Sequence, residues 1–274
     1  MKLTKALALS LAALVAAGAI AGCGDQKKEA KAPADKKEIT VGITSGYSEQ
    51  VMEFVAKEAE KDGLKVNLKS FGDYVTPDAA LAAGEIDLNS YQHGPYLEAY
   101  NEKNGTKLIS IGNTYLAPLR IYSNKYKDLK DVPDGARVSI PNDPSNGGRA
   151  LALLQSAKLL KLKDGVGVKA TVGDIVGNDK KLKIVEIEAA LLPRSMDDTD
   201  LSVINSNFAM EAKLNPVKDS LFTEPKESPY ANIVAVRKGD ENRPEIQKLM
   251  NALRSPEVKK FIDEKYKGAV VAAF

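Results

Sequence analysis

The sequence predicts an α/β protein built as two lobes with a cleft between them. Short β-branched strands alternate with amphipathic helices along most of the 274 residues, which is typical of parallel βαβ units. The pattern restarts near residue 134, so that a helix before Glu85–Leu88 is echoed by a helix before Thr199–Ile204. The length suffices for two modest domains. It also leaves open a single doubly wound sheet, which is the alternative architecture.

Four strands and three helices are expected in the first half. The strands are short alternating or β-branched segments, namely Ile39–Ile43, Leu64–Leu68, Ile86–Leu88 and Lys107–Ile111. Between them, Ser48 is predicted to cap a helix whose apolar residues recur at helical spacing. Thr76 and Pro77 are predicted to begin a second helix, and Pro95 a third that ends near Gly105.

The second half repeats this order. Its predicted strands are Ala136–Ile140, Lys183–Ile187, Leu201–Ile204 and Ala231–Val236. Its predicted helices are Arg149–Leu160, a short one near Ala189, one from Glu245 and Pro256–Tyr266. The links between lobes are predicted at 115–121 and 222–231. The first lobe then comprises 38–118 and 224–274, and the second 119–223.

The N-terminus is typical of a secreted lipoprotein. Lys2 and Lys5 precede an apolar run, Leu7–Ile20, that is too short to be a convincing membrane span. Small residues then lead to Cys23, as in a bacterial lipobox. We therefore expect a signal peptide at 1–22, and a lipidated Cys23 with a flexible tether at 23–37. The alternative is an ordinary signal peptide followed by a chance cysteine.

Composition excludes several classes of function. One His and one Cys exclude an intrachain disulfide and zinc sites that need two histidines. The 39 basic residues include Lys2 and Lys5, so without the leader 37 basic residues face 37 acidic ones. A neutral chain has no electrostatic bias toward nucleic acid. We expect no metal, since the acidic residues near 197–200 do not have the spacing of an EF-hand.

His93 lies in a polar and aromatic segment, 89–96, between a predicted strand and a predicted helix. Loops that follow strands often place ligand contacts, so His93 is a candidate binding residue. A structural hydrogen bond is the alternative role. A hydrolase would need His93 as its base, although the chain has no Gly-x-Ser-x-Gly motif to partner it.

Arg149 follows a glycine-containing loop, 141–148, at a predicted helix start. The glycines at 147 and 148 allow the backbone to come close to a ligand, and a helix N-terminus favours anions. A cation is unfavourable there, so a bound carboxylate would explain Arg149, which matches it in bidentate geometry. A plain turn with an exposed arginine is the alternative.

Tyrosines and asparagines complete the candidate site. Tyr74, Tyr91 and Tyr96 lie at turns or helix starts and together suit an apolar slot, in which a thioether packs well. Asn205 and Asn232 follow or precede strands, and their amide oxygens suit a ligand ammonium. Ordinary packing and turn capping are the alternatives for each.

Six segments carry a resemblance to a known family. They are the lipobox, PheGlyAspTyrValThrProAsp (71–78), AsnSerTyrGlnHisGlyProTyrLeu (89–97), ProAsnAspProSerAsnGlyGlyArgAla (141–150), ValIleAsn (203–205) and GluSerProTyrAlaAsn (227–232). In this order they resemble the NlpA/MetQ-type methionine-binding lipoproteins. The resemblance covers residues 39–274. It implies a two-lobed periplasmic-binding-protein fold and a lipid-anchored, extracytoplasmic protein, which we expect to be monomeric, that feeds an ABC importer, its permease and ATPase.

The resemblance also implies residue roles, with no catalysis and no cofactor. The aromatic pocket falls on Tyr74, Tyr91 and Tyr96, with His93 beside it. The carboxylate clamp falls on Arg149, and the polar contacts on Asn205 and Asn232. Tyr91 departs from the phenylalanine common in the family, and its hydroxyl would need a partner if buried. The neighbouring Asn207 leaves open which asparagine contacts the ligand.

The ligand expected from these features is L-methionine. Three alternatives stay open: another apolar amino acid or a methionine-containing dipeptide, a lipid-anchored hydrolase using His93, and a surface adhesin that keeps the fold without transport.

Overall fold

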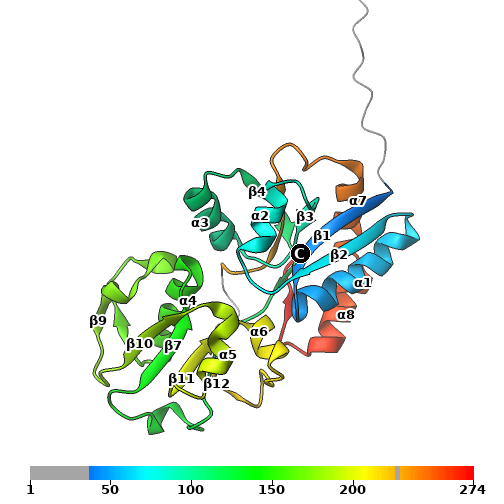
Figure 1. Cartoon of the computed structure of the whole chain (residues 1–274). Coiled ribbons are helices and arrows are strands. Elements are labelled where there is room, and N and C mark those ends of the chain that lie inside the picture. The colour runs from blue at the N-terminus through cyan, green and yellow to red at the C-terminus, as the bar shows by residue number, and fades with distance from the viewer. Residues whose placement is uncertain (1–36, 226–228) are drawn as a thin grey trace, which may run out of the picture. The chain divides into compact units, whose positions relative to one another are not determined.

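Two five-stranded sheets organise the molecule (Figure 1). The computed structural model describes residues 37–225 and 229–274, so the predicted leader, Cys23 and nearly all of the predicted tether lie outside the described residues. The strand order is β2-β1-β3-β13-β4 in the first sheet and β10-β7-β11-β6-β12 in the second. The α/β prediction is confirmed, and the single doubly wound sheet is wrong. The predicted lobe boundaries stay a prediction.

The first sheet is mixed. Strand β1 (Glu38–Thr44) pairs in parallel with β2 (Lys65–Phe71) and with β3 (Leu88–Asn89). Strand β13 (Ile233–Arg237) is antiparallel to both β3 and β4 (Leu108–Asn113). The late strand β13 therefore inserts into the middle of a sheet made mostly by the first part of the chain.

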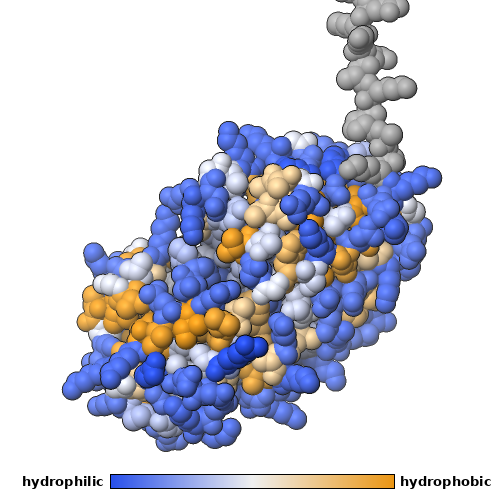
Figure 2. Space-filling view, viewed as in Figure 1, coloured by the Kyte–Doolittle hydropathy of each residue, from blue (hydrophilic) through white to orange (hydrophobic). Residues whose placement is uncertain are grey.

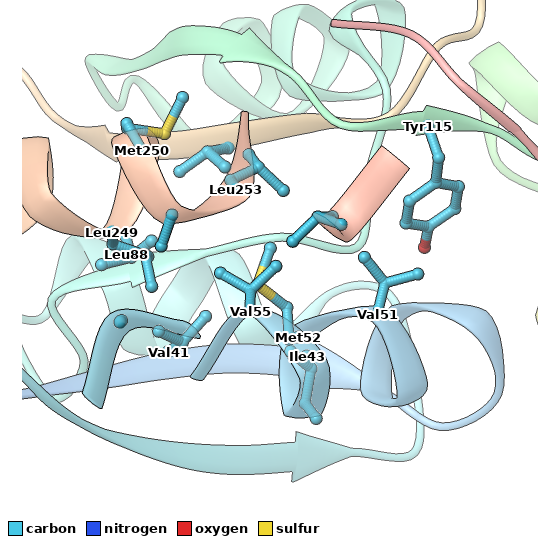
Figure 3. Packing of buried hydrophobic residues seen from close by; sticks show 14 of the residues in the cluster. Val41, Ile43, Val51, Met52, Val55, Leu88, Tyr115, Leu249, Met250 and Leu253 are labelled. Carbon is cyan, nitrogen blue, oxygen red and sulfur yellow. The ribbon is translucent and has the colours of Figure 1, made fainter. Parts of the chain in front are cut away.

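Helices cover both faces of this sheet. One face packs against α1 (Tyr47–Lys61), α7 (Pro244–Leu253) and α8 (Pro256–Tyr266), whose apolar side chains meet those of β1 (Figure 3). The other face packs against α2 (Thr76–Ala82) and α3 (Gly94–Asn104). Strand β13 joins both clusters, because successive strand residues point to opposite faces.

The second sheet has the same mixed character. Strand β7 (Arg137–Pro141) is parallel to β10 (Lys183–Ile187) and β11 (Leu201–Ile204). Strand β6 (Arg120–Tyr122) is antiparallel to β11 and to β12 (Ser220–Thr223). The chain thus leaves the first sheet before β6 and returns to it after β12.

The remaining elements flank these sheets. The core of the second sheet is closed by α4 (Pro144–Ser156) on one side and by α5 (Leu192–Ser195) and α6 (Ser206–Glu211) on the other. The other short elements are β5 (Tyr115–Leu116), η1 (Leu129–Asp131), β8 (Lys161–Leu162), η2 (Gly167–Lys169), η3 (Val172–Asp174), β9 (Ile175–Gly177), η4 (Ala189–Leu191) and β14 (Val271–Ala272).

Hydrophilic side chains cover much of the visible face, with apolar side chains gathered over the lobe of the second sheet (Figure 2). The exposed large apolar residues are Val75, Val168, Val176, Leu191 and Val217. No helix within 37–225 or 229–274 has the length and apolar character that crossing a membrane requires.

Two predicted helix starts are wrong in their details. Helix α1 begins at Tyr47 after Gly46, and the Ser48 hydroxyl donates to the Ser90 carbonyl instead of capping. Before α2, the Asp73 carboxylate accepts from the backbone N–H groups of Val75 and Thr76, each at 2.7 Å. At α2 the Asp73 carboxylate thus replaces the hydroxyl cap that the sequence favoured, whereas the N-cap Gly46 of α1 makes no side-chain cap hydrogen bond.

Helix α4 begins five residues earlier than predicted. Asp143 is its N-cap, and the Asp143 carboxylate accepts from Asn146 N–H at 2.9 Å. Most of the predicted loop 141–148 is therefore helix. Gly147 and Gly148 were expected to let the backbone approach a ligand, but a Cβ added at either position would meet a backbone carbonyl of the protein, that of Pro141 or that of Val168.

Replacing Gly148 by alanine should destabilise the fold. The added Cβ would lie 2.5 Å from the Val168 carbonyl oxygen and 3.1 Å from that of Ala170, so α4 and η2 must move apart. We expect the free energy of unfolding to fall by about 1–3 kcal/mol, measured by chemical denaturation. Gly94→Ala is the matched control, since its Cβ meets nothing within 4 Å. Equal stability of the two variants would contradict this account.

Candidate functional site

A pocket lies among residues that follow strands of both sheets. All seven predicted binding residues line it: Tyr74, Tyr91, His93, Tyr96, Arg149, Asn205 and Asn232. The lining residues that sequence reasoning missed are Thr44, Tyr47, Gln92, Tyr115, Ala117, Asn146, Ser206 and Asn207, the last named only as an alternative to Asn205.

The carboxyl ends of the strands bring these residues together. Tyr91 and His93 follow β3, and Asn205 follows β11 directly. Arg149 lies on α4, which follows β7. Ligands of open α/β sheets bind at this end of the strands, which is why residues far apart in sequence converge here.

Three tyrosines form one wall of the pocket. Their ring centroids are 5.8–6.2 Å apart. The Tyr91 and Tyr96 hydroxyls both donate to the Tyr74 carbonyl oxygen, at 2.6 and 2.9 Å. Burial raises the pKa of Tyr74 and Tyr91 well above the ordinary value, so both stay neutral. The Tyr91 hydroxyl, which departs from the family pattern, therefore has a partner within the protein.

Tyr74 also reaches the opposite side of the pocket. Its hydroxyl donates to Asn207 Oδ1, and its ring lies 4.9 Å from that of Phe208. Both partners belong to α6, beside the second sheet, whereas Tyr74 precedes α2 beside the first sheet. Tyr74 thus links the two sides of the pocket.

His93 is held by two hydrogen bonds. Nδ1 accepts from Tyr96 N–H at 3.2 Å, which caps α3, and Nε2 lies 3.1 Å from Asn146 Oδ1. This pattern assigns the ring proton to Nε2. Burial, together with the charge of Arg149, lowers the pKa of His93 to about 3. A neutral imidazole with both nitrogens occupied is not available as the base of a hydrolase.

Asn146 is the centre of a buried polar network. Its Oδ1 accepts from His93 and, at 2.9 Å, from Asn205 Nδ2. Its own Nδ2 donates to both carboxylate oxygens of Asp143, at 3.1 and 3.0 Å. The spacing of Asp143 and Asn146, three residues apart at a helix start, is the sequence signal that would have suggested this pair. Within the described residues, the buried Asn205 Oδ1 has no hydrogen-bond partner.

Arg149 is 4% exposed and is paired with a residue that sequence reasoning missed. Its Nε lies 2.8 Å from Glu224 Oε1, and its Nη2 lies 2.5 Å from Glu224 Oε2. Nη2 also donates to the Ala117 carbonyl at 3.2 Å, and the guanidinium lies 4.5 Å from the centre of the Tyr230 ring. No hydrogen bond among the described residues uses Nη1.

The predicted reason for Arg149 is therefore corrected. Because α4 begins at Pro144, Arg149 lies beyond the first turn and does not face an unfavourable dipole position. Glu224 already supplies an anionic partner. No motif around Glu224 indicated this, because the pair joins segments 75 residues apart.

Asn232 is held against the tyrosine wall. Its Nδ2 donates to the Tyr91 carbonyl at 3.1 Å, and its backbone forms a bridge with His93. Asn205 and Asn207 both line the pocket. No group of three potential metal ligands occurs in the described residues, and in the acidic segment near 197–200 Asp200 pairs with Lys125.

This geometry is that of a two-lobed substrate-binding protein. The chain belongs to the NlpA lipoprotein family, whose model matches residues 39–274. It is 44% identical to the D-methionine-binding lipoprotein MetQ of Escherichia coli K12 over 96% of both chains. The same identity relates it to a probable D-methionine-binding lipoprotein MetQ of Vibrio cholerae, over 99% of both chains.

Solved structures give the same result. A nutrient-binding protein from Burkholderia cenocepacia bound to methionine is 50% identical, with a TM-score of 0.83 over 86% of this chain and 100% of that chain. The methionine-binding protein MetQ is 45% identical, with a TM-score of 0.84 over 87% and 98%. These matches confirm the family and the fold that the motifs predicted.

Protonation of His93 should destabilise the protein in acid. Its pKa is lowered from 6.5 to about 3 in the fold, so the unfolded chain takes up a proton first and stability is lost as pH falls from 6.5 toward 3. At pH 5 this loss is about 2 kcal/mol. The measurement is denaturant unfolding at pH 7 and pH 5.

His93→Gln supplies the comparison. Burial raises the pKa of Asp78 to about 6, which acts in the opposite direction, but that contribution is common to both proteins and cancels. The loss of stability between pH 7 and pH 5 should therefore be smaller in His93→Gln than in the unaltered protein. An identical pH dependence would show that His93 is not buried as described.

Proposed function

We propose that this chain captures methionine outside the cytoplasm and delivers it to an ABC importer. The observation that carries the proposal is the pocket itself, in which Nη1 of Arg149 and the buried amide oxygens of Asn205 and Gln92 are available beside an aromatic wall. An amino acid has a carboxylate, an ammonium and a side chain to match these three features. The names of the relatives support methionine as the particular ligand.

Each part of methionine has a partner of suitable chemistry. Nη1 of Arg149 is the donor for the carboxylate, and the amide oxygen of Asn205 is the acceptor for the ammonium. Asn232 lies close to both the histidine and the tyrosines. The thioether packs against Tyr74, Tyr91 and Tyr96, whose hydroxyls are already paired and require nothing from an apolar ligand.

Enclosure is required by the size of the ligand. Methionine has about nine non-hydrogen atoms, and the ceiling of roughly 1.5 kcal/mol per atom limits its binding free energy to about 13 kcal/mol. Tight capture therefore needs nearly every atom in contact with protein. The Tyr74–Asn207 and His93–Asn146 hydrogen bonds join the two sides of the pocket and fit a hinge that closes over the ligand.

The cellular setting follows from the family and from the N-terminus. We propose that a lipid on Cys23 anchors the chain in the cell envelope, and that the folded part acts as a monomer with the permease and its ATPase as partners. The NlpA lipoprotein family supports membrane anchoring outside the cytoplasm. This role requires no catalytic residue and no cofactor.

Calorimetry of the folded part with an amino-acid panel tests the ligand. We expect L-methionine to bind most tightly among the L-amino acids, because only its side chain offers a thioether to the tyrosine wall. The panel includes D-methionine, which the relatives' names specify, and a methionine-containing dipeptide. Preference for a ligand without a thioether would overturn the methionine proposal.

Arg149→Ala should weaken methionine binding by about 2–5 kcal/mol, because it leaves a buried ligand carboxylate without its charged partner. The same change also removes the guanidinium that Glu224 binds, so the loss is measured by calorimetry in both the single variant and Arg149→Ala with Glu224→Gln. The double variant also removes the charge of that carboxylate and separates ligand contact from stability. A loss of only a few-fold in both would exclude Arg149 as the carboxylate partner.

A further inference from the structure

We propose that Glu224 determines the charge class of the ligand, making the site selective for a zwitterion over an anion or a cation. This inference rests on the proposed binding of an amino acid. Glu224 itself is not among the residues that line the pocket, and it acts through Arg149. It is therefore a positioning and specificity-determining residue rather than a ligand contact.

The first step of the argument is the charge of the pocket. Arg149 is the only charged side chain among the described residues that line it, since His93 is neutral. The Glu224 carboxylate binds that guanidinium through two nitrogens, and its side chain is 9% exposed. The Arg149–Glu224 pair therefore has a formal charge of zero, although it presents a cationic donor at Nη1.

The second step concerns the ligand. A zwitterion brings no net charge to this neutral pair, so neither partner leaves an uncompensated charge in a low-dielectric interior. A monoanion that lacks the ammonium would leave one negative charge in excess and the Asn205 oxygen unpaired. A cation that lacks the carboxylate would leave one positive charge in excess.

The third step is that Glu224 is held in place independently of Arg149. Its Oε2 accepts from Leu119 N–H at 3.1 Å, and its own N–H donates to the Leu119 carbonyl at 2.9 Å. Its charge is therefore fixed beside the guanidinium by the two segments that cross between the sheets, one before β6 and one after β12. A glutamate held in this way keeps Arg149 both oriented and neutralised.

Calorimetry with three matched ligands tests the proposal in the folded protein. L-methionine is the zwitterion, 4-(methylsulfanyl)butanoate is the anion without the ammonium, and methioninol is the cation without the carboxylate. In Glu224→Gln, Arg149 loses its counter-charge. The affinity of the anion relative to methionine should rise on the order of ten- to a hundredfold, and that of the cation should fall.

A structural role alone gives a different result. If Glu224 only supports the crossing segments, Glu224→Gln weakens all three ligands by a similar factor and leaves their ratios within about twofold of the original; this overturns the proposal. Asp87→Asn is the matched control, because it removes the carboxylate of the partly buried Arg243–Asp87 pair. In this variant the ratios among the affinities for the three ligands should not change.

Two further outcomes are distinguishable. If the unaltered protein does not bind methionine, the proposed function fails and this inference fails with it. If it binds methionine but the ratios do not respond to Glu224→Gln, this inference alone fails. Should that variant not fold, Glu224→Ala with added formate is the second test: formate should restore the preference for methionine over the anion, and no restoration overturns the proposal.

Discussion

The ion pair between Arg149 and Glu224 is the interaction on which the rest of the site depends. A buried guanidinium without a counter-charge costs several kcal/mol, and the bidentate carboxylate removes that cost. Because Arg149 comes from α4 and Glu224 follows β12, the pair also attaches the second sheet to a segment that returns to the first. The pocket is thereby built around a cation that is neutralised before any ligand arrives.

Most other polar groups of the pocket are also satisfied within the protein. Tyr91 and Tyr96 donate to one carbonyl, and His93 is bonded at both ring nitrogens. The few groups left over then determine what binds, because a ligand that fails to match a buried unpaired oxygen loses about 1–3 kcal/mol. A pocket with many unpaired groups would be costly to fold, whereas one with few is both stable and selective.

Local sequence patterns predicted well where the strands lie and that the candidate residues come together at one pocket. They predicted poorly which side chains pair across long stretches of sequence. The strand ends indicated that His93 and Asn205 lie near each other, and both line the same pocket, since the carboxyl ends of parallel strands share an edge. The start of α4 was misplaced, because Pro144 and two glycines resemble a loop while Asp143 supplies the actual cap. Glu224 was missed, because its role comes from a contact across 75 residues that leaves no local signal.

If the lobes close over the ligand as proposed, the two segments that cross between the sheets couple this closure to ligand binding. They are bonded to one another through Leu119 with Glu224 and through Tyr115 with Asn232, whose N–H donates to the Tyr115 carbonyl at 2.7 Å. The same segments therefore carry the counter-charge of Arg149 and one of the amides of the pocket. A rotation of the lobes that displaces these segments also changes the donors offered to the ligand. A ligand can favour one arrangement only through contacts that differ between arrangements, and under the proposed closure these two segments would supply such contacts.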